Sequence, residues 1–164
     1  MISLAVLASG LAIAVVIDVR TRRIPNWLTG SLAAGGLGMA FAGGGVTPGQ
    51  AALGLLAGLA LMMPAHLIGA TGAGDVKLMA AVGAVVGPGG ALRAFLFTAL
   101  AGGAFAMVVA ARRGRLADTI HGTTQLVTSP ATARHTIESS DRANRFAYGP
   151  AIAIGTLLSI MVNS

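Results

Sequence analysis

Residues 51–87 read AALGLLAGLALMMPAHLIGATGAGDVKLMAAVGAVVG, two apolar runs separated by a short polar interruption. The runs, 51–70 and 76–86, have the composition of helices in lipid. The interruption carries Asp75 and Lys77 directly after a pair of glycines. Because an ionised side chain within a membrane segment costs roughly 2.5 to 3.5 kcal/mol on insertion scales, we expect these charges to lie at the end of a span and to serve a function.

The same apolar character extends over most of the chain. Of its 164 residues 55% are hydrophobic and 10% charged, and its mean hydropathy is +0.81, which is typical of a membrane protein. A span needs about 20 mostly apolar residues, so the chain has room for about six spans and for no sizeable soluble domain. We therefore predict an all-α, polytopic membrane protein that forms one domain over residues 1–164. The predicted spans are 2–17, 27–42, 51–70, 76–86, 91–111 and 147–162.

The positive charges predict how these spans are oriented. Three arginines follow the first span within residues 18–26, and the connector 112–146 is also rich in arginine, whereas the connectors 43–50 and 87–90 are uncharged. Loops rich in Lys and Arg stay in the cytoplasm, so we expect both termini outside and the 112–146 connector inside. This bias accounts for the net charge of +6, and since no stacking aromatic residues accompany the arginines, we expect no nucleic-acid partner.

Several kinds of site are excluded or disfavoured by residue content. Cysteine is absent, which excludes disulfides, a thiolate nucleophile and any Cys-ligated metal. His66 has no second ligand at metal-binding spacing, and a packed or interfacial role is the expectation for it. Nucleotide and flavin signatures are also absent, so we expect neither a metal nor a cofactor.

Two acidic residues lie next to the spans. Asp18 follows the first span and Asp75 opens the fourth, and the predicted topology places both at the cytoplasmic ends of their helices. Two carboxyls at one depth can share a proton and activate a water, one as base and one as acid, as amide hydrolysis requires. Which of them is the base stays open, because a close pair titrates as a unit. Two separate interfacial residues at helix ends are the alternative.

The turn before Asp75 consists of Gly72, Ala73 and Gly74. Glycines adopt backbone angles closed to other residues and leave room for another chain, so we expect this turn to be an active-site loop that receives an extended substrate. A simple glycine break between two helices is the alternative. Lys77 belongs to the same loop. It does not share the helix face of Asp75. We expect it to anchor the topology or to contact lipid phosphate, and a contact with substrate is the second alternative.

The order of these motifs resembles a known family. IDVRTRRIPNWLT (17–29) followed by GAGDVKLMAAVGAVVG (72–87) is similar to the type IV prepilin peptidases, which are GxGD intramembrane aspartic proteases. AYGPAIAIGTLL (147–158) resembles the last span of that family. The resemblance implies that Asp18 and Asp75 are the catalytic pair.

Two neighbouring residues are expected to support that pair. Pro25 and Asn26 are suited to the turn that starts the second helix, where they would help to place Asp18. Their predicted role near the site is therefore structural.

The resemblance also implies a substrate and a location. The substrate would be a prepilin with a short basic leader, a glycine before the scissile bond and an apolar helix held in the bilayer. Cleavage would occur at the cytoplasmic face of the bacterial inner membrane. Larger family members carry a cysteine-bearing region and a methyltransferase activity, so this chain is expected to be the short, peptidase-only form that serves Flp-type (tight adherence) pili. Its oligomeric state is not predicted.

Two other functions stay open. A proton-coupled transporter also uses intramembrane carboxylates, although these would lie deeper and along a path between the two faces. A non-catalytic membrane subunit of a pilus or secretion machine could instead pair its aspartates with arginines across helices. Cleavage of a prepilin-like peptide separates the peptidase from both.

Overall fold

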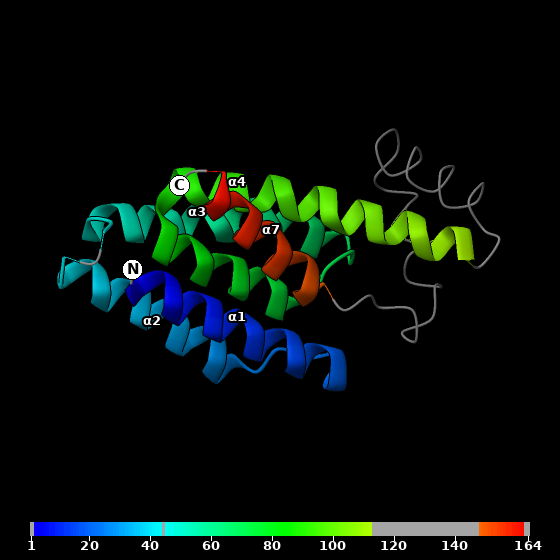
Figure 1. Cartoon of the computed structure of the whole chain (residues 1–164), viewed down its shortest axis with the longest axis horizontal. Coiled ribbons are helices and arrows are strands. Elements are labelled where there is room, and N and C mark those ends of the chain that lie inside the picture. Colours follow the sequence, from blue (N-terminus) through cyan, green and yellow to red (C-terminus); the bar gives the residue numbers. More distant parts are fainter. Residues whose placement is uncertain (1, 44, 113–147, 163–164) are drawn as a thin grey trace.

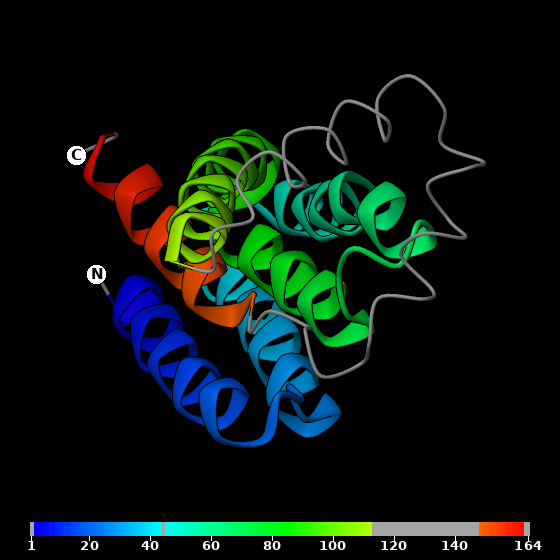
Figure 2. The same cartoon turned by 90° about the vertical axis from the view of Figure 1, so that its right-hand side faces the viewer.

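The structure is a computed structural model that describes residues 2–43, 45–112 and 148–162. Every element in these ranges is a helix, which confirms the all-α prediction for them. In chain order the helices are α1 (Ile2–Thr21), α2 (Asn26–Phe41), α3 (Pro48–Leu67), α4 (Ala73–Arg112) and α7 (Gly149–Met161). They form a bundle with their axes broadly along one direction (Figures 1 and 2). The predicted 112–146 connector begins at the last residue of α4, and its remainder lies outside the described residues.

The helix α4 is interrupted at Gly87. This residue has φ 75° and ψ 177°, a conformation open to glycine and closed to side chains, and Pro88, which lacks an N–H, starts the next helical segment. Figure 1 shows the chain reversing direction there, so that segments 73–86 and 88–112 run back along each other. The predicted break between the fourth and fifth spans is thereby confirmed. The first segment rises only about 21 Å at 1.5 Å per residue, as its short apolar run indicates.

Within the described ranges, three helices, α1, α3 and α4, are long and apolar enough to cross a membrane. The helix α2 has 16 residues, and α7 is apolar but has 13. These lengths agree with a membrane protein, while six crossings and the orientation of the termini stay predictions.

The ends of the third helix differ from the predicted span 51–70. The helix α3 begins earlier, at Pro48, because Thr47 and Gln50 form a capping box that satisfies two backbone groups at its start. It ends earlier, at Leu67, and the chain then turns through Gly69, which has φ 80°. The connection that follows leads directly into α4.

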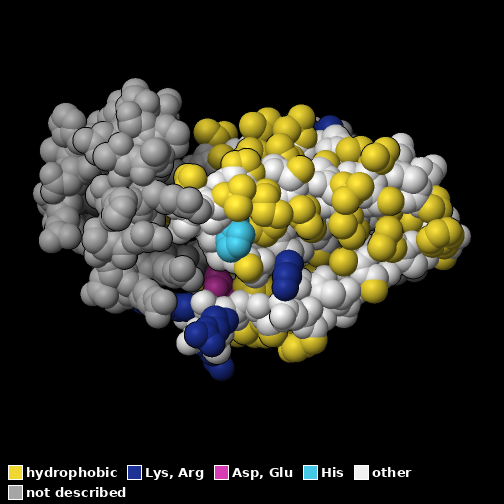
Figure 3. All heavy atoms as spheres, turned by 180° about the vertical axis from the view of Figure 1, so that it is seen from behind, with side chains coloured by type: hydrophobic (Ala, Val, Ile, Leu, Met, Phe, Trp, Pro, Cys, Tyr) yellow, Lys and Arg dark blue, Asp and Glu magenta, His cyan; other side chains and the backbone are white. Residues whose placement is uncertain are grey.

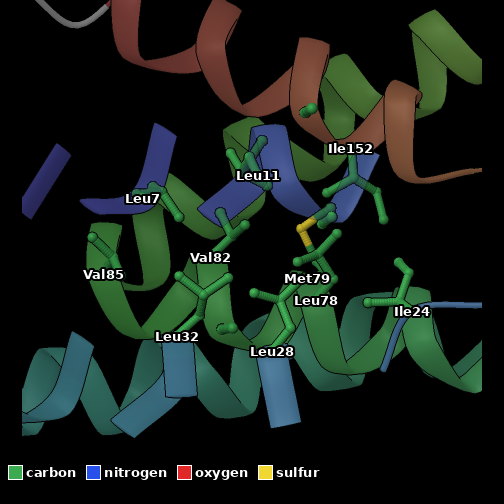
Figure 4. Close-up of a cluster of buried hydrophobic side chains, with 14 of the residues drawn as sticks. Leu7, Leu11, Ile24, Leu28, Leu32, Leu78, Met79, Val82, Val85 and Ile152 are labelled. Atoms are coloured by element: carbon green, nitrogen blue, oxygen red, sulfur yellow. The ribbon is translucent and has the colours of Figure 1, made fainter. Parts of the chain in front are cut away.

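The helix α4 packs against α3, α7 and α2, and its first segment is buried at nearly every position. Its side chains meet those of α1, α2 and α7 in the core shown in Figure 4. The residues labelled there include Leu7, Leu11, Leu28, Leu32, Met79, Val82 and Ile152, each less than a tenth exposed. The core thus joins α1, α2 and α7 around one short segment of α4.

Small residues let α3 approach this segment closely. A Cβ added to Gly58 would lie 2.8 Å from the carbonyl carbon of Met79, and one added to Gly54 would lie 2.8 Å from that of Gly83. Only glycine permits such a distance between backbones. Because lipid is as apolar as leucine, helix association in a membrane depends on this kind of close packing.

The ends of four helices gather at one end of the bundle. The C-terminus of α1 and the N-termini of α2, α4 and α7 all lie at the end away from the N and C labels in Figure 1. Asp18 and Asp75 therefore come to the same end of the molecule, as the sequence predicts.

Candidate active site

Asp18 lies inside α1 rather than after it. The helix continues past the predicted end at Ile17 to Thr21, whose hydroxyl donates to the Ile17 carbonyl at 2.8 Å. Arg22 then ends the helix: its N–H donates to the Asp18 carbonyl at 2.7 Å, and its φ of 52° turns the chain away. Asp18 is thereby held in a helical turn with its side chain 5% exposed.

The carboxylate of Asp18 is bound by the start of α7. The backbone N–H of Gly149, the first residue of that helix, donates to Asp18 Oδ2 at 2.9 Å. The first amides of a helix have no partner within it and carry the positive end of its dipole, so they suit a carboxylate. A Cβ on Gly149 would lie 2.7 Å from the same oxygen, which explains why glycine stands there.

Asp75 lies in the first turn of α4, as predicted, and is 7% exposed. Its Oδ2 accepts the backbone N–H of Gly72 at 3.0 Å, the contact that an acidic third residue makes with the N-cap amide in a capping box. A Cβ on Gly72 would lie 3.2 Å from this oxygen. The glycine and the carboxylate thus form a local unit that starts the helix.

Gly74 permits a close approach by the chain itself. A Cβ there would lie 3.0 Å from Cβ of Ile24, which is 9% exposed and precedes α2. The side of Gly74 toward which a Cβ would point is therefore occupied by Ile24. Ala73, in contrast, is exposed and is the part of the turn open to another chain.

Lys77 is bound to the start of α2. Its Nζ donates to Oδ1 of Asn26 at 2.8 Å, although 51 residues separate them. Asn26 is the first residue of α2, and Pro25 is its N-cap in an extended conformation, so the predicted turn is confirmed. With the contact between Ile24 and Gly74, this hydrogen bond holds the loop before α2 against the first turn of α4.

The two carboxyls and His66 form one electrostatic group. The charges of Asp18 and Asp75 interact with each other, and that of Asp75 also interacts with His66. His66 lies in the last turn of α3, and its Nδ1 is 3.0 Å from the Thr71 carbonyl. Among the described residues, no group of three metal-ligating side chains lies together.

Tyr148 lies beside this group. It is half-buried directly before α7, and its phenol interacts with the nearby Asp75 carboxyl. Sequence analysis missed Tyr148 and Gly149 as site residues. The available signal was the order Tyr-Gly-Pro immediately before an apolar run, which marks a helix start but not what that helix start binds.

The group reaches the molecular surface. Figure 3 shows a small acidic surface next to the histidine, with lysine and arginine side chains close by and a broad apolar surface beyond. The exposed cations at this end include Arg20, Arg23 and Lys77. Two interacting carboxyls at such a surface can activate a water for attack on a peptide bond, one acting as base and the other as acid.

Comparison with known proteins identifies a family for most of the chain. The model of the type IV leader peptidase family matches residues 5–107, which include both aspartates, the loop before α2 and the GxGD turn. The match ends before Tyr148 and Gly149. No curated protein and no solved structure matches the chain significantly.

Proposed function

Because the chain belongs to the type IV leader peptidase family, we propose that it is an aspartic endopeptidase in which Asp18 and Asp75 together cleave the leader peptide of a type IV prepilin. The family makes the chain a peptidase, and the observation that supports the aspartic mechanism is the pairing of these carboxyls. They come from helices far apart in the sequence, lie buried at one end of the bundle and interact electrostatically.

The contacts of the pair suit activation of a water. Within the described residues each carboxyl accepts its hydrogen bond on Oδ2, from Gly149 for Asp18 and from Gly72 for Asp75. Among the same residues Oδ1 of each carboxyl accepts no hydrogen bond, and we propose that it contacts the water and the substrate. One carboxylate takes a proton from the water as it attacks the scissile carbonyl, and the other, protonated, donates a proton as the peptide bond breaks. After one cleavage the first carboxyl carries the proton and the second has lost it, so the two exchange roles. A close pair of this kind titrates as one unit.

The proposed substrate matches the surroundings of the pair. A prepilin has an apolar helix that lies in the bilayer, and the outer faces of the helices here expose large apolar side chains such as Val16, Leu56 and Leu96. The basic leader, in contrast, is repelled by the exposed arginines at this end. Anionic lipid headgroups would have to lie between the arginines and the leader. The same arginines support an active site at the cytoplasmic face of the inner membrane.

The transporter alternative is less well supported. Proton transfer across a membrane needs groups along a path between the two faces. Asp18 lies near the C-terminus of α1 and Asp75 in the first turn of α4, and these two helix ends lie at one end of the bundle (Figure 1), which favours local chemistry. If the purified protein conducted protons in liposomes and left prepilins intact, the transporter would be favoured.

The test is cleavage of a Flp-type prepilin by the purified protein in liposomes, with product masses measured. The wild type is expected to release the leader, and a prepilin with its glycine before the scissile bond replaced serves as the substrate control. Asp18→Asn and Asp75→Asn should each lose activity by at least about three orders of magnitude, as loss of an essential acid or base does. Normal cleavage by either variant would refute the proposal.

A further inference from the structure

We infer that the start of α7 positions Asp18 for catalysis, with Tyr148 resting on Gly102 and the adjacent Gly149 amide holding the carboxylate. This inference rests on the proposed function of the two aspartates. It assigns a role in the site to residues that lie outside the range matched by the family model.

The first step concerns what holds α1 in place. The helix α1 shares a larger interface with α7 than with α4, the helix that carries Asp75. The distance between the two carboxyls is therefore not set mainly by direct packing of α1 on α4. Both α2 and α7 contact α1 as well as α4, and α7 shares the larger interface with α1, so the distance depends strongly on α7.

The second step concerns what holds α7 in place. Two glycine contacts fix it against the second segment of α4. A Cβ on Gly155 would lie 2.7 Å from Cα of Thr98, and a Cβ on Gly102 would lie 2.6 Å from the Tyr148 hydroxyl oxygen. Thr98 and Gly102 are four residues apart and so share one face of α4. The start of α7 thus lies directly on that face.

The third step joins this contact to the carboxyls. Tyr148 is adjacent to Gly149, whose amide binds Asp18 Oδ2, and its phenol interacts with the charge of Asp75. A methyl group at Gly102 displaces the Tyr148 ring, and the part of this displacement that rotation of the side chain does not absorb moves the adjacent Gly149 amide. A displacement of about 1 Å in a reacting group can cost on the order of 10²-fold in rate, so catalysis should respond to the packing at Gly102.

Two adjacent glycines provide a matched test. In Gly102→Ala the new methyl group meets Tyr148, whereas in Gly103→Ala it meets nothing within 4 Å. We expect Gly102→Ala to lower kcat for prepilin cleavage at least about tenfold with KM little changed. Gly103→Ala should stay within about twofold of the wild type in both constants. A Gly102→Ala variant with the kcat of Gly103→Ala would overturn the inference.

A second variant tests the same contact by removing the Tyr148 hydroxyl oxygen. Tyr148→Phe deletes the hydroxyl oxygen that lies nearest to the added methyl group, so it should recover part of the kcat lost in Gly102→Ala. A loss that Tyr148→Phe does not relieve would contradict the inference. Should Gly102→Ala not fold, Tyr148→Ala probes the same contact without added atoms. An unchanged kcat in that variant would also refute it.

Asp18→Asn and Asp75→Asn are measured alongside to separate the two proposals. If these variants cleave normally, the proposed aspartic mechanism fails. If they are inactive while Gly102→Ala equals its control, only the positioning role of α7 fails.

Discussion

Gly149 donates its backbone N–H to Asp18 Oδ2 at 2.9 Å, across 131 residues of sequence. The donor is the first residue of the last described helix, and the acceptor lies in the last turns of the first. Both groups are buried, so water has little access to replace this hydrogen bond. The contact connects α1 and α7 at the end of the bundle where Asp75 also lies.

A side chain at Gly149 should disturb catalysis directly. In Gly149→Ala the added methyl group would lie 2.7 Å from Asp18 Oδ2, so the carboxylate has to move. We expect kcat to fall on the order of 10²-fold, because the reacting group is displaced while the substrate surface is unchanged. Gly30→Ala, where nothing lies within 4 Å, is the control and should keep wild-type cleavage. Equal kinetics in the two variants would show that Asp18 tolerates the shift.

The capping and the proposed catalytic role of Asp75 should be separable. Asn keeps an oxygen that can accept the Gly72 N–H, so Asp75→Asn should unfold thermally at nearly the wild-type temperature while losing activity. Asp75→Ala loses the cap as well and should be less stable by about 1 kcal/mol. Thermal unfolding in detergent measures both. Equal stability of the two variants would mean that the cap contributes little.

The hydrogen bond between Lys77 and Asn26 should couple the two residues. Its donor and acceptor are exposed, so we expect Lys77→Met and Asn26→Ala each to cost only about 0.5 kcal/mol in stability. If they act through this bond, the double variant should be no worse than either single one, both in stability and in cleavage rate. Fully additive losses would show that the two side chains act independently.

The close packing of α3 on α4 should be sensitive to single methyl groups. Gly58→Ala forces a Cβ to within 2.8 Å of the Met79 carbonyl carbon, where backbone cannot give way easily. We expect a loss of roughly 1 to 3 kcal/mol in the free energy of unfolding, as for overpacked cores. Gly49→Ala in the same helix has open space around it and is the matched control. Indistinguishable unfolding of the two variants would contradict the packing described here.

Much of the fold was accessible from the sequence because its signals are local. The apolar runs predicted helices, Gly87 and Pro88 predicted the break in α4, and Asp75 after Gly72 predicted a helix start. Local signals also misled, since Asp18 and the arginines after it suggested that the first helix ends at Ile17. Polar residues are compatible with a further helical turn once packing supports it, and α1 runs on to Thr21.

The contacts that assemble the site were not accessible in the same way. Ile24 on Gly74, Lys77 on Asn26 and Gly149 on Asp18 join residues that are distant in the chain. Each depends on how helices pack, and hydropathy patterns carry no information about which helix faces meet.

By itself the sequence determined the helical class, the breaks between helices and the two carboxyls at helix ends, because hydropathy, glycine, proline and capping act over a few residues. The tertiary structure alone decided that α7 delivers an amide to Asp18 and that the loop before α2 covers Gly74. These depend on backbones approaching at glycines on separate helices, a condition of shape that exists only once the helices are packed together.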